Sequence, residues 1–153
     1  MSNPAKGLAI VVKNSKWTGG VDHYAICDGE GYVIHNMPGT GVRKDSEEDF
    51  FSSSVEAKPD EDLVTAAQRA VSEGKLVVTQ AIPHEANIVV SRAKAMIGTR
   101  YNLLSFNCEH FARKCFEGTA YSTQIQKFAR GATAMGLLGL AGIWLFSRRG
   151  ERA

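Results

Sequence analysis

The sequence is most informative at Phe106-Asn-Cys-Glu-His-Phe111, where a helix-capping residue precedes a cysteine. Asparagine is a favoured N-cap residue, so Asn107 predicts a helix that begins at Cys108. A thiol in the first turn of a helix lies beside backbone N–H groups and the positive end of the helix dipole, which lower thiol pKa values. The same N–H groups can bind the oxyanion of an acyl-transfer intermediate. Cys108 is therefore a candidate nucleophile.

Two histidines offer the base that a cysteine nucleophile needs. His23 and His35 lie in two strand-like runs, 22–27 and 32–36, joined by Asp28-Gly-Glu-Gly31, a strong hairpin signal. A three-residue loop would place the two histidines directly opposite each other, whereas a four-residue loop would turn them to opposite faces. The sequence alone leaves both registers open. With both rings on one face under the helix N-terminus, a Cys-His-His constellation results, but each ring could instead be an ordinary residue of the sheet.

The other cysteines and the histidine beside the nucleophile have structural interpretations. Cys115 lies seven residues after Cys108 on one helical stripe, and Cys27 lies in a predicted strand, so both are read as core residues. His110 points to another side of the helix and is also interpreted as structural. No His, Cys, Asp or Glu set has metal-ligand spacing, and no glycine-rich phosphate loop precedes a helix. We therefore expect no metal and no cofactor.

Apolar runs and turn residues predict a small α+β domain, with strands first and helices later. The predicted strands are 8–12, 22–27, 32–36 and 76–81. The predicted helices run from Pro59-Asp60 to Glu73, from Pro83 to Ile97, and from Asn107 to the residue before Gly118. The buried stripe expected for the first of these helices consists of Leu63, Ala67, Ala70 and Val71.

The segment 37–60 is polar and rich in turn residues, and we read it as a mobile excursion with room for one extra strand. It contains an acidic run, from Asp45 to Asp49, that ends in Phe50-Phe51. These two aromatic side chains could dip into a lipid surface or pack within the domain, and the sequence does not choose between the two.

Composition restricts the class of protein. The chain has 153 residues, enough for one domain, with 44% hydrophobic and 22% charged residues and a net charge of +2. These values exclude a disordered chain, a collagen-like repeat and a protein with many membrane spans. Three cysteines without a C-x-x-C pair argue against a disulfide framework and a zinc ribbon, and indicate a reducing compartment. No basic patch is interleaved with aromatic residues, so nucleic acid is not an expected partner.

The C-terminal segment is strongly apolar. Residues 131–146 contain no charge and would form a helix of about 24 Å, against a hydrocarbon core of about 30 Å. Extension back to Phe128, with Trp144 near the other end and basic residues beyond it, is typical of a membrane anchor. The alternative, a buried core helix, would normally carry a polar face, which this segment lacks. The prediction divides the chain into a catalytic domain at 1–126, an anchor helix at 128–147 and a basic tail at 148–153. The expected location is the membrane, with the catalytic domain on its cytoplasmic side.

The sequence resembles the lecithin retinol acyltransferase (LRAT)-like family, which includes the HRAS-like suppressor phospholipase/acyltransferases. Tyr101-Asn-Leu-Leu-Ser-Phe-Asn-Cys-Glu-His-Phe111 is similar to the nucleophile motif of that family, and its Asn-Cys-Glu-His-Phe core is highly specific. Asp22-His-Tyr-Ala-Ile26 and Tyr32-Val-Ile-His35 match the two histidine strands, with the histidines twelve residues apart. Downstream, Gly118-Thr-Ala-Tyr-Ser-Thr-Gln-Ile125 resembles the stretch after the nucleophile helix.

The resemblance implies a circularly permuted papain-like (NlpC-type) α+β domain, in which the histidines precede the cysteine along the chain. It implies that Cys108 is the nucleophile, His23 the general base and acid, and His35 the residue that orients His23. It also implies a phospholipase A or acyltransferase, with a glycerophospholipid as substrate. Such an enzyme forms an acyl-cysteine intermediate and passes the acyl group to water or to a lipid acceptor. Retinol as the acceptor is not supported by any residue.

Two other functions stay open at this point. A thiol peptidase or amidase of the wider NlpC-type superfamily would act in a polar, open groove, whereas a lipid enzyme is favoured by a membrane anchor and an apolar acyl channel. A membrane-tethered interaction module could keep the fold without the activity, although the intact Cys108, His23 and His35 argue against it.

Overall fold

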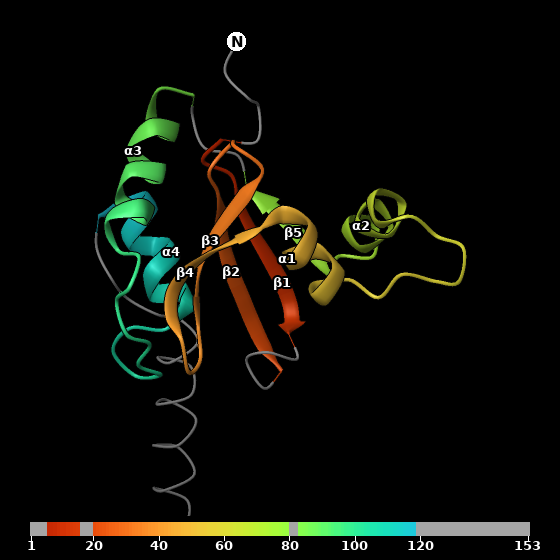
Figure 1. The fold of residues 1–153 in the computed structure, drawn as a ribbon, viewed down its shortest axis with the longest axis horizontal. Helices are drawn as coiled ribbons and strands as arrows, with labels where there is room; N and C mark the ends of the chain where they lie inside the picture. Colours follow the sequence, from red (N-terminus) through yellow and green to blue (C-terminus); the bar gives the residue numbers. More distant parts are fainter. Residues whose placement is uncertain (1–5, 16–19, 80–82, 119–153) are drawn as a thin grey trace, which may run out of the picture. The chain divides into compact units, whose positions relative to one another are not determined.

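The computed structural model describes residues 6–15, 20–79 and 83–118 (Figure 1). The chain divides into two units, Met1–Ser122 and Thr123–Ala153, and all described residues belong to the first. In chain order the elements are β1 (Ala9–Ser15), β2 (Val21–Cys27), β3 (Tyr32–Met37), β4 (Gly41–Ser46), α1 (Glu47–Ser54), α2 (Leu63–Ser72), β5 (Leu76–Thr79), α3 (Pro83–Ala95) and α4 (Cys108–Glu117). Strands therefore come first and helices later, as the sequence predicts.

The strands form one antiparallel sheet in the order β4-β3-β2-β1-β5 (Figure 1). β2, which carries His23, is the central strand, with β1 on one side and β3 on the other. The connections from β2 to β3 and from β3 to β4 make two consecutive hairpins. The prediction of a small antiparallel sheet in an α+β fold is confirmed for the described part of the chain.

Helices cover both faces of the sheet, because successive side chains of a strand point to opposite faces and both faces are apolar. Helices α3 and α4 pack on one face, where the core consists of Ala9, Ile26, Ile34, Val42, Val89, Ala93, Met96, Phe111, Ala112 and Cys115. Helices α1 and α2 cover the other face, where the core consists of Ile10, Val12, Ala25, Cys27, Val33, Phe50, Val55, Ala66, Ala70 and Leu76. His23 and His35 are odd-numbered like Ala25 and Val33, so their rings lie on the α1 side.

Residues 37–60 depart most from the prediction, because much of this segment is regular structure and not a mobile excursion. It contains the extra strand, β4, and also the helix α1, which sequence analysis missed. Ser46 ends the strand and caps the helix, its hydroxyl accepting the backbone N–H of Asp49 at 3.0 Å. Gly41 begins β4 with φ of +83°, and an added Cβ there would collide with the carbonyl oxygen of Thr99. The helix has little amphipathic pattern because six of its eight residues are serines or acids and its two apolar residues, Phe50 and Phe51, are adjacent.

Helix α2 begins at Leu63, after its N-cap Asp62, three to four residues later than predicted. Its buried residues are Ala66 and Ala70, whereas Val71 is 47% exposed. The predicted stripe is therefore right for Ala70 and wrong for Val71. The small alanine side chains allow the helix to approach the rest of the α1 face closely.

The last two described helices agree with the sequence. Helix α3 starts at Pro83 as predicted and ends two residues before Ile97. Helix α4 ends at Gly118, which takes the left-handed conformation at φ of +76° that favours glycine. Within the described residues, no helix combines the length and apolar character needed to cross a bilayer. The predicted anchor at 128–147 and the tail at 148–153 lie outside the described residues.

Candidate active site

Helix α4 begins as predicted, with Cys108 as its first residue. The side chain of Asn107 accepts the backbone N–H groups of Glu109 at 3.0 Å and His110 at 3.1 Å. In return, Nδ1 of His110 accepts the backbone N–H of Asn107 at 3.3 Å, which completes a reciprocal capping box. His110 therefore caps the helix, in agreement with its structural interpretation, and the thiol of Cys108 is held at the helix N-terminus.

The thiol of Cys108 contacts the backbone of β2 on either side of His23. Its S–H donates to the carbonyl oxygen of Asp22 at 3.5 Å, and the N–H of Tyr24 hydrogen-bonds to the sulfur. The N–H and C=O groups of Cys27 hydrogen-bond on the β1 side of the strand. The side to which these groups point alternates from one residue to the next along a strand. Those of Asp22 and Tyr24 therefore point toward the β3 side. On that side the pairing of β2 with β3 ends at Ala25 and His35. The sulfur thus lies beside the backbone of His23, where the two strands separate.

The two histidine rings are in direct contact. Nε2 of His23 lies 2.9 Å from Nδ1 of His35, and the ring centroids are 5.2 Å apart at an angle of 71°. Both residues are fully buried. The register pairs His35 with Ala25, so the two histidines are diagonal neighbours and not directly opposite. The connection after the Cys27–Val33 pair has five residues, an odd number like three, and this parity keeps both rings on one face.

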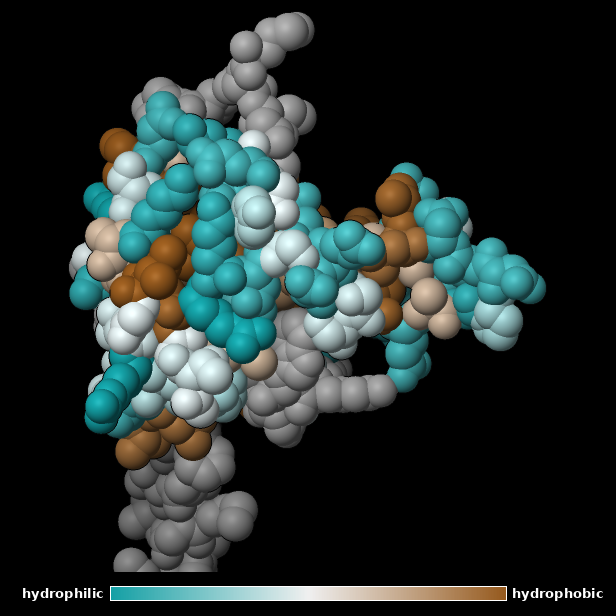
Figure 2. All heavy atoms as spheres, in the orientation of Figure 1, coloured by the Kyte–Doolittle hydropathy of each residue, from teal (hydrophilic) through white to brown (hydrophobic). Residues whose placement is uncertain are grey.

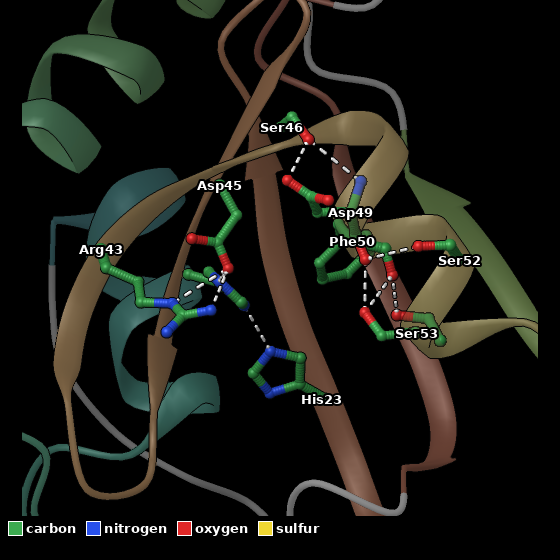
Figure 3. Close-up of polar contacts among 10 residues, drawn as sticks. His23, Arg43, Asp45, Ser46, Asp49, Phe50, Ser52 and Ser53 are labelled. Atoms are coloured by element: carbon green, nitrogen blue, oxygen red, sulfur yellow. Dashed lines mark hydrogen bonds and ion pairs between the residues drawn. The ribbon is translucent and has the colours of Figure 1, made fainter.

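An aspartate that sequence analysis did not single out completes the array. Oδ2 of Asp45, on β4, lies 3.0 Å from Nε2 of His35. Arg43 donates from Nε to the same oxygen at 2.9 Å and also from its terminal nitrogen (Figure 3). The signal that could have revealed Asp45 is Pro38-Gly39, a turn pair that predicts a hairpin after the His35 strand. That hairpin places Arg43 opposite His35 and brings Asp45 within reach.

Phe50 of α1 covers the two rings from the solvent side. Its ring centroid lies 6.2 Å from that of His23 and 5.4 Å from that of His35, and the residue is 1% exposed. Phe51 is half-buried and packs against the same core. Insertion of Phe50 into a lipid surface is therefore ruled out, because its ring is occupied in excluding water from the histidine pair.

Burial dominates the electrostatics of the site. Desolvation, with a smaller contribution from the charge of His35, lowers the pKa of His23 to about 3. Desolvation also lowers the pKa of His35, against the hydrogen bond that His35 donates to Asp45, which raises it. For Asp45, burial raises the pKa, but the hydrogen bonds with Arg43 and His35 outweigh burial and lower it. At neutral pH the rings are therefore neutral and Asp45 is a carboxylate.

The expected lowering of the thiol pKa is not found. Burial raises the pKa of Cys108 to about 11, although the N–H groups of Tyr24, Glu109 and Cys108 itself lower it. The residue is 2% exposed, and the loss of solvent outweighs the helix N-terminus. The resting state of the closed site is thus a neutral thiol and a neutral imidazole, and not a thiolate–imidazolium pair.

The remaining cysteines are buried in the two cores, and burial raises the pKa of both Cys27 and Cys115 to about 12. Both match their interpretation as core residues. Among the described residues, no group of three or more His, Cys, Asp or Glu side chains is placed to hold a metal ion. A cavity of about 1100 Å³ lies between β1, α1, α2 and β5, but its lining includes neither Cys108 nor the histidines.

The fold and the site define a class of mixed α/β domains. In this class a thiol at a helix N-terminus lies beside the backbone of the sheet strand that carries one of two buried, hydrogen-bonded imidazoles. The family model described as lecithin retinol acyltransferase matches residues 3–121 of the chain. The chain belongs to this family.

Three relatives illustrate the similarity, two of them over most of their own length. Phospholipase A and acyltransferase 4 of Homo sapiens is 32% identical over 143 residues, which cover 87% of this chain and 86% of the relative. Phospholipase A and acyltransferase 2 of Homo sapiens is 28% identical over 161 residues, covering 99% of this chain and 98% of the relative. Lecithin retinol acyltransferase of Bos taurus is 33% identical over 114 residues, covering 67% of this chain and 44% of the relative.

Proposed function

We propose that this chain is a cysteine-dependent phospholipase A and acyltransferase that acts on a glycerophospholipid. The observation that carries the proposal is the position of the Cys108 thiol, hydrogen-bonded to the peptide groups on either side of His23. A nucleophile, a candidate base and a residue that orients the base are thereby gathered from three elements, α4, β2 and β3. The names of the relatives supply the substrate class.

The chain of hydrogen bonds supports an assignment of the ring nitrogen that acts as the base. The carboxylate of Asp45 accepts the Nε2–H of His35, so Nδ1 of His35 is an acceptor. That nitrogen accepts the Nε2–H of His23. In neutral His23 the lone pair then resides on Nδ1. We assign this nitrogen as the general base, and Asp45 as a positioning residue that acts through His35.

The proposed reaction begins when Nδ1 of His23 takes the proton of the Cys108 thiol. The sulfur attacks the ester carbonyl carbon, and backbone N–H groups at the start of α4, including that of Cys108, receive the oxyanion. When the tetrahedral intermediate collapses, the C–O bond breaks and His23 returns the proton to the leaving alcohol of the lysophospholipid. Water or a lipid acceptor then loses its proton to His23 and attacks the thioester. The acyl group leaves on this second nucleophile, and the sulfur recovers the proton.

Closure of the site has a function in this scheme. A buried imidazolium is costly when isolated, but the one formed here is hydrogen-bonded through His35 to the carboxylate of Asp45. The imidazolium charge therefore appears only when a substrate is present for the sulfur to attack. This arrangement protects the thiol from solvent between turnovers, in keeping with its raised pKa.

Further parts of the function stay predictions. We propose that the protein is membrane-associated through an anchor helix at 128–147, with the catalytic domain, 1–126, on the cytoplasmic side. We also propose that the order of histidine strands before nucleophile helix reflects a circularly permuted papain-like arrangement. A thiol peptidase or amidase, or a non-enzymatic module, remains the alternative that the following experiment addresses.

The test uses the full chain with vesicles of phosphatidylcholine and phosphatidylethanolamine, followed by mass spectrometry of the protein. We expect a fatty acyl adduct on Cys108 and release of fatty acid or of an acylated lipid amine. Cys108→Ser should remove the adduct, whereas the matched variant Cys115→Ala should keep it. Peptide cleavage without an adduct or fatty acid would replace the lipid reaction by the amidase. An adduct on a different residue would overturn the assignment of Cys108.

A further inference from the structure

Two leucines protrude from the turn that precedes the nucleophile helix. Leu103 is 57% exposed and Leu104 is 68% exposed. In Figure 2 hydrophobic atoms gather at the lower edge of the described residues, where Figure 1 places the connection between α3 and α4. Val21, which is 43% exposed, begins β2. It directly precedes Asp22, whose carbonyl oxygen accepts the hydrogen bond of the Cys108 thiol. Apolar side chains thus face solvent at the end of the domain where the sulfur lies.

The turn is a built structure. Oδ1 of Asn102 accepts the backbone N–H groups of Leu104 at 3.0 Å and Ser105 at 2.9 Å. Asn102 and Phe106 also exchange both backbone hydrogen bonds, at 3.0 Å and 2.8 Å. The two leucines are therefore held outward by a closed ring of hydrogen bonds, although burying them would remove apolar surface from water.

The same turn is fastened to the nucleophile helix and to the sheet. Nδ2 of Asn107, the N-cap of α4, donates to the carbonyl oxygen of Leu103 at 3.1 Å. Nδ2 of Asn36, on β3, donates to the carbonyl oxygen of Phe106 at 2.7 Å. Asn107, the cap that positions Cys108, is thus also hydrogen-bonded to the exposed turn. A force on the leucines is transmitted to the start of α4 through one side chain.

We propose that the turn Asn102–Ser105 docks the enzyme on a phospholipid bilayer by inserting Leu103 and Leu104 among the acyl chains. This proposal rests on the proposed function and specifies how its substrate reaches the site. Insertion would place the start of α4, with the buried thiol of Cys108, at the depth of the ester groups.

The chemistry of the turn favours a bilayer over a protein partner. Two side chains at a convex tip are far short of the roughly 800 Å² per partner that a stable protein interface buries. Exposed polar residues, Asn102 and Ser105, flank the leucines, and the exposed Arg100 precedes them with no acidic residue between Arg100 and Asn107. The apolar leucines suit the acyl chains, the polar residues beside them suit the interface, and the arginine suits the phosphate groups.

The test compares Leu103→Ser/Leu104→Ser with Val64→Ser in the full chain. Val64 lies on α2 and is 67% exposed, so the control removes an equally exposed apolar side chain elsewhere. Rates are measured on phosphatidylcholine vesicles and on a short-chain phosphatidylcholine below its micelle concentration. We expect the double variant to lose about tenfold or more of the vesicle rate and to stay within about twofold on the monomeric lipid. The Val64 variant should change neither rate by more than about twofold.

A second variant reports insertion without catalysis. In a Cys108→Ser background whose own tryptophans, Trp17 and Trp144, are replaced by phenylalanine, Leu104→Trp should show a blue shift of its tryptophan emission on vesicle addition, and Val64→Trp should not. Equal loss of both rates in the double variant, loss of neither, or equal shifts in the two tryptophan variants would overturn the docking role. These emission shifts do not require turnover, so they keep docking distinguishable from a failure of the proposed reaction.

Discussion

The thiol side and the histidine side of the site are held by structure of different range. Cys108 is positioned by a capping box within four residues of sequence, from Asn107 to His110. The histidine side requires contacts between residues that are 12 and 10 positions apart, in His23–His35 and His35–Asp45, and a covering ring from α1. The start of α4 is therefore built locally, although its thiol meets β2 across 86 positions of sequence, whereas the histidine side needs three strands and a helix for its own contacts. Perturbations should affect the two sides unequally.

Removal of the base should have the largest effect. We expect His23→Gln to lower kcat/KM on a phospholipid by about 10³–10⁴, because general base catalysis typically contributes up to this factor. The matched variant is His110→Gln, since glutamine at this position can still close the capping box. Its activity should fall by less than about threefold. A His23→Gln enzyme with more than a tenth of the normal rate would show that another group accepts the thiol proton.

The cover of the histidine side should be the more fragile packing element. Phe50→Ala should lower the free energy of unfolding by about 3–5 kcal/mol, because it opens a cavity over two buried rings. Phe51→Ala, at the half-buried neighbouring position, should lower it by about 1 kcal/mol. Urea unfolding of the two variants measures the difference. Equal losses would mean that Phe50 does not have the special covering role assigned to it.

The same difference in range explains how much the sequence reveals. The N-cap at Asn107, the helix stop at Gly118 and the strands of His23 and His35 depend on neighbours in the chain, and all were predicted. The diagonal pairing of the histidines depends on the five residues that separate the paired Cys27 and Val33, whereas local signals favoured a loop of three or four residues. Asp45 and Phe50 were missed as site residues because β4 and α1 gain their place through contacts with β3 and the rings. The predicted lowering of the Cys108 pKa was wrong for a related reason, because the burial of the thiol is determined by the whole fold and not by the start of the helix.

Acid should weaken the histidine side before the thiol side. The pKa of His23 is lowered to about 3 in the folded protein, so between pH 6.5 and 3 the unfolded chain binds a proton that the folded chain excludes. Stability contributed by the neutral ring is present above about pH 6.5 and is lost as the pH falls. At pH 4.5 the loss from one such imidazole is about 3 kcal/mol. His23→Gln should remove this loss, so its unfolding free energy should fall less steeply as the pH is lowered through this window, as measured by urea unfolding at several pH values. An unchanged slope would contradict a neutral, buried His23.

The smallest of these effects concerns the outermost member of the array. Asp45→Asn removes a charge but leaves an amide oxygen that can still accept the Nε2–H of His35, so the ring tautomers survive. We expect kcat to fall by about tenfold with little change in KM, since the lost interaction stabilises the imidazolium formed during the reaction. Because Asp45 raises the pKa of His35, its removal should also move the acid limb of the pH–rate profile to lower pH. Glu48→Gln makes the same charge change at an exposed position of the acidic run and should leave the profile in place. A fall in kcat without movement of the acid limb would mean that Asp45 only braces the β3–β4 hairpin, and the charge of the carboxylate would then have no part in stabilising the imidazolium.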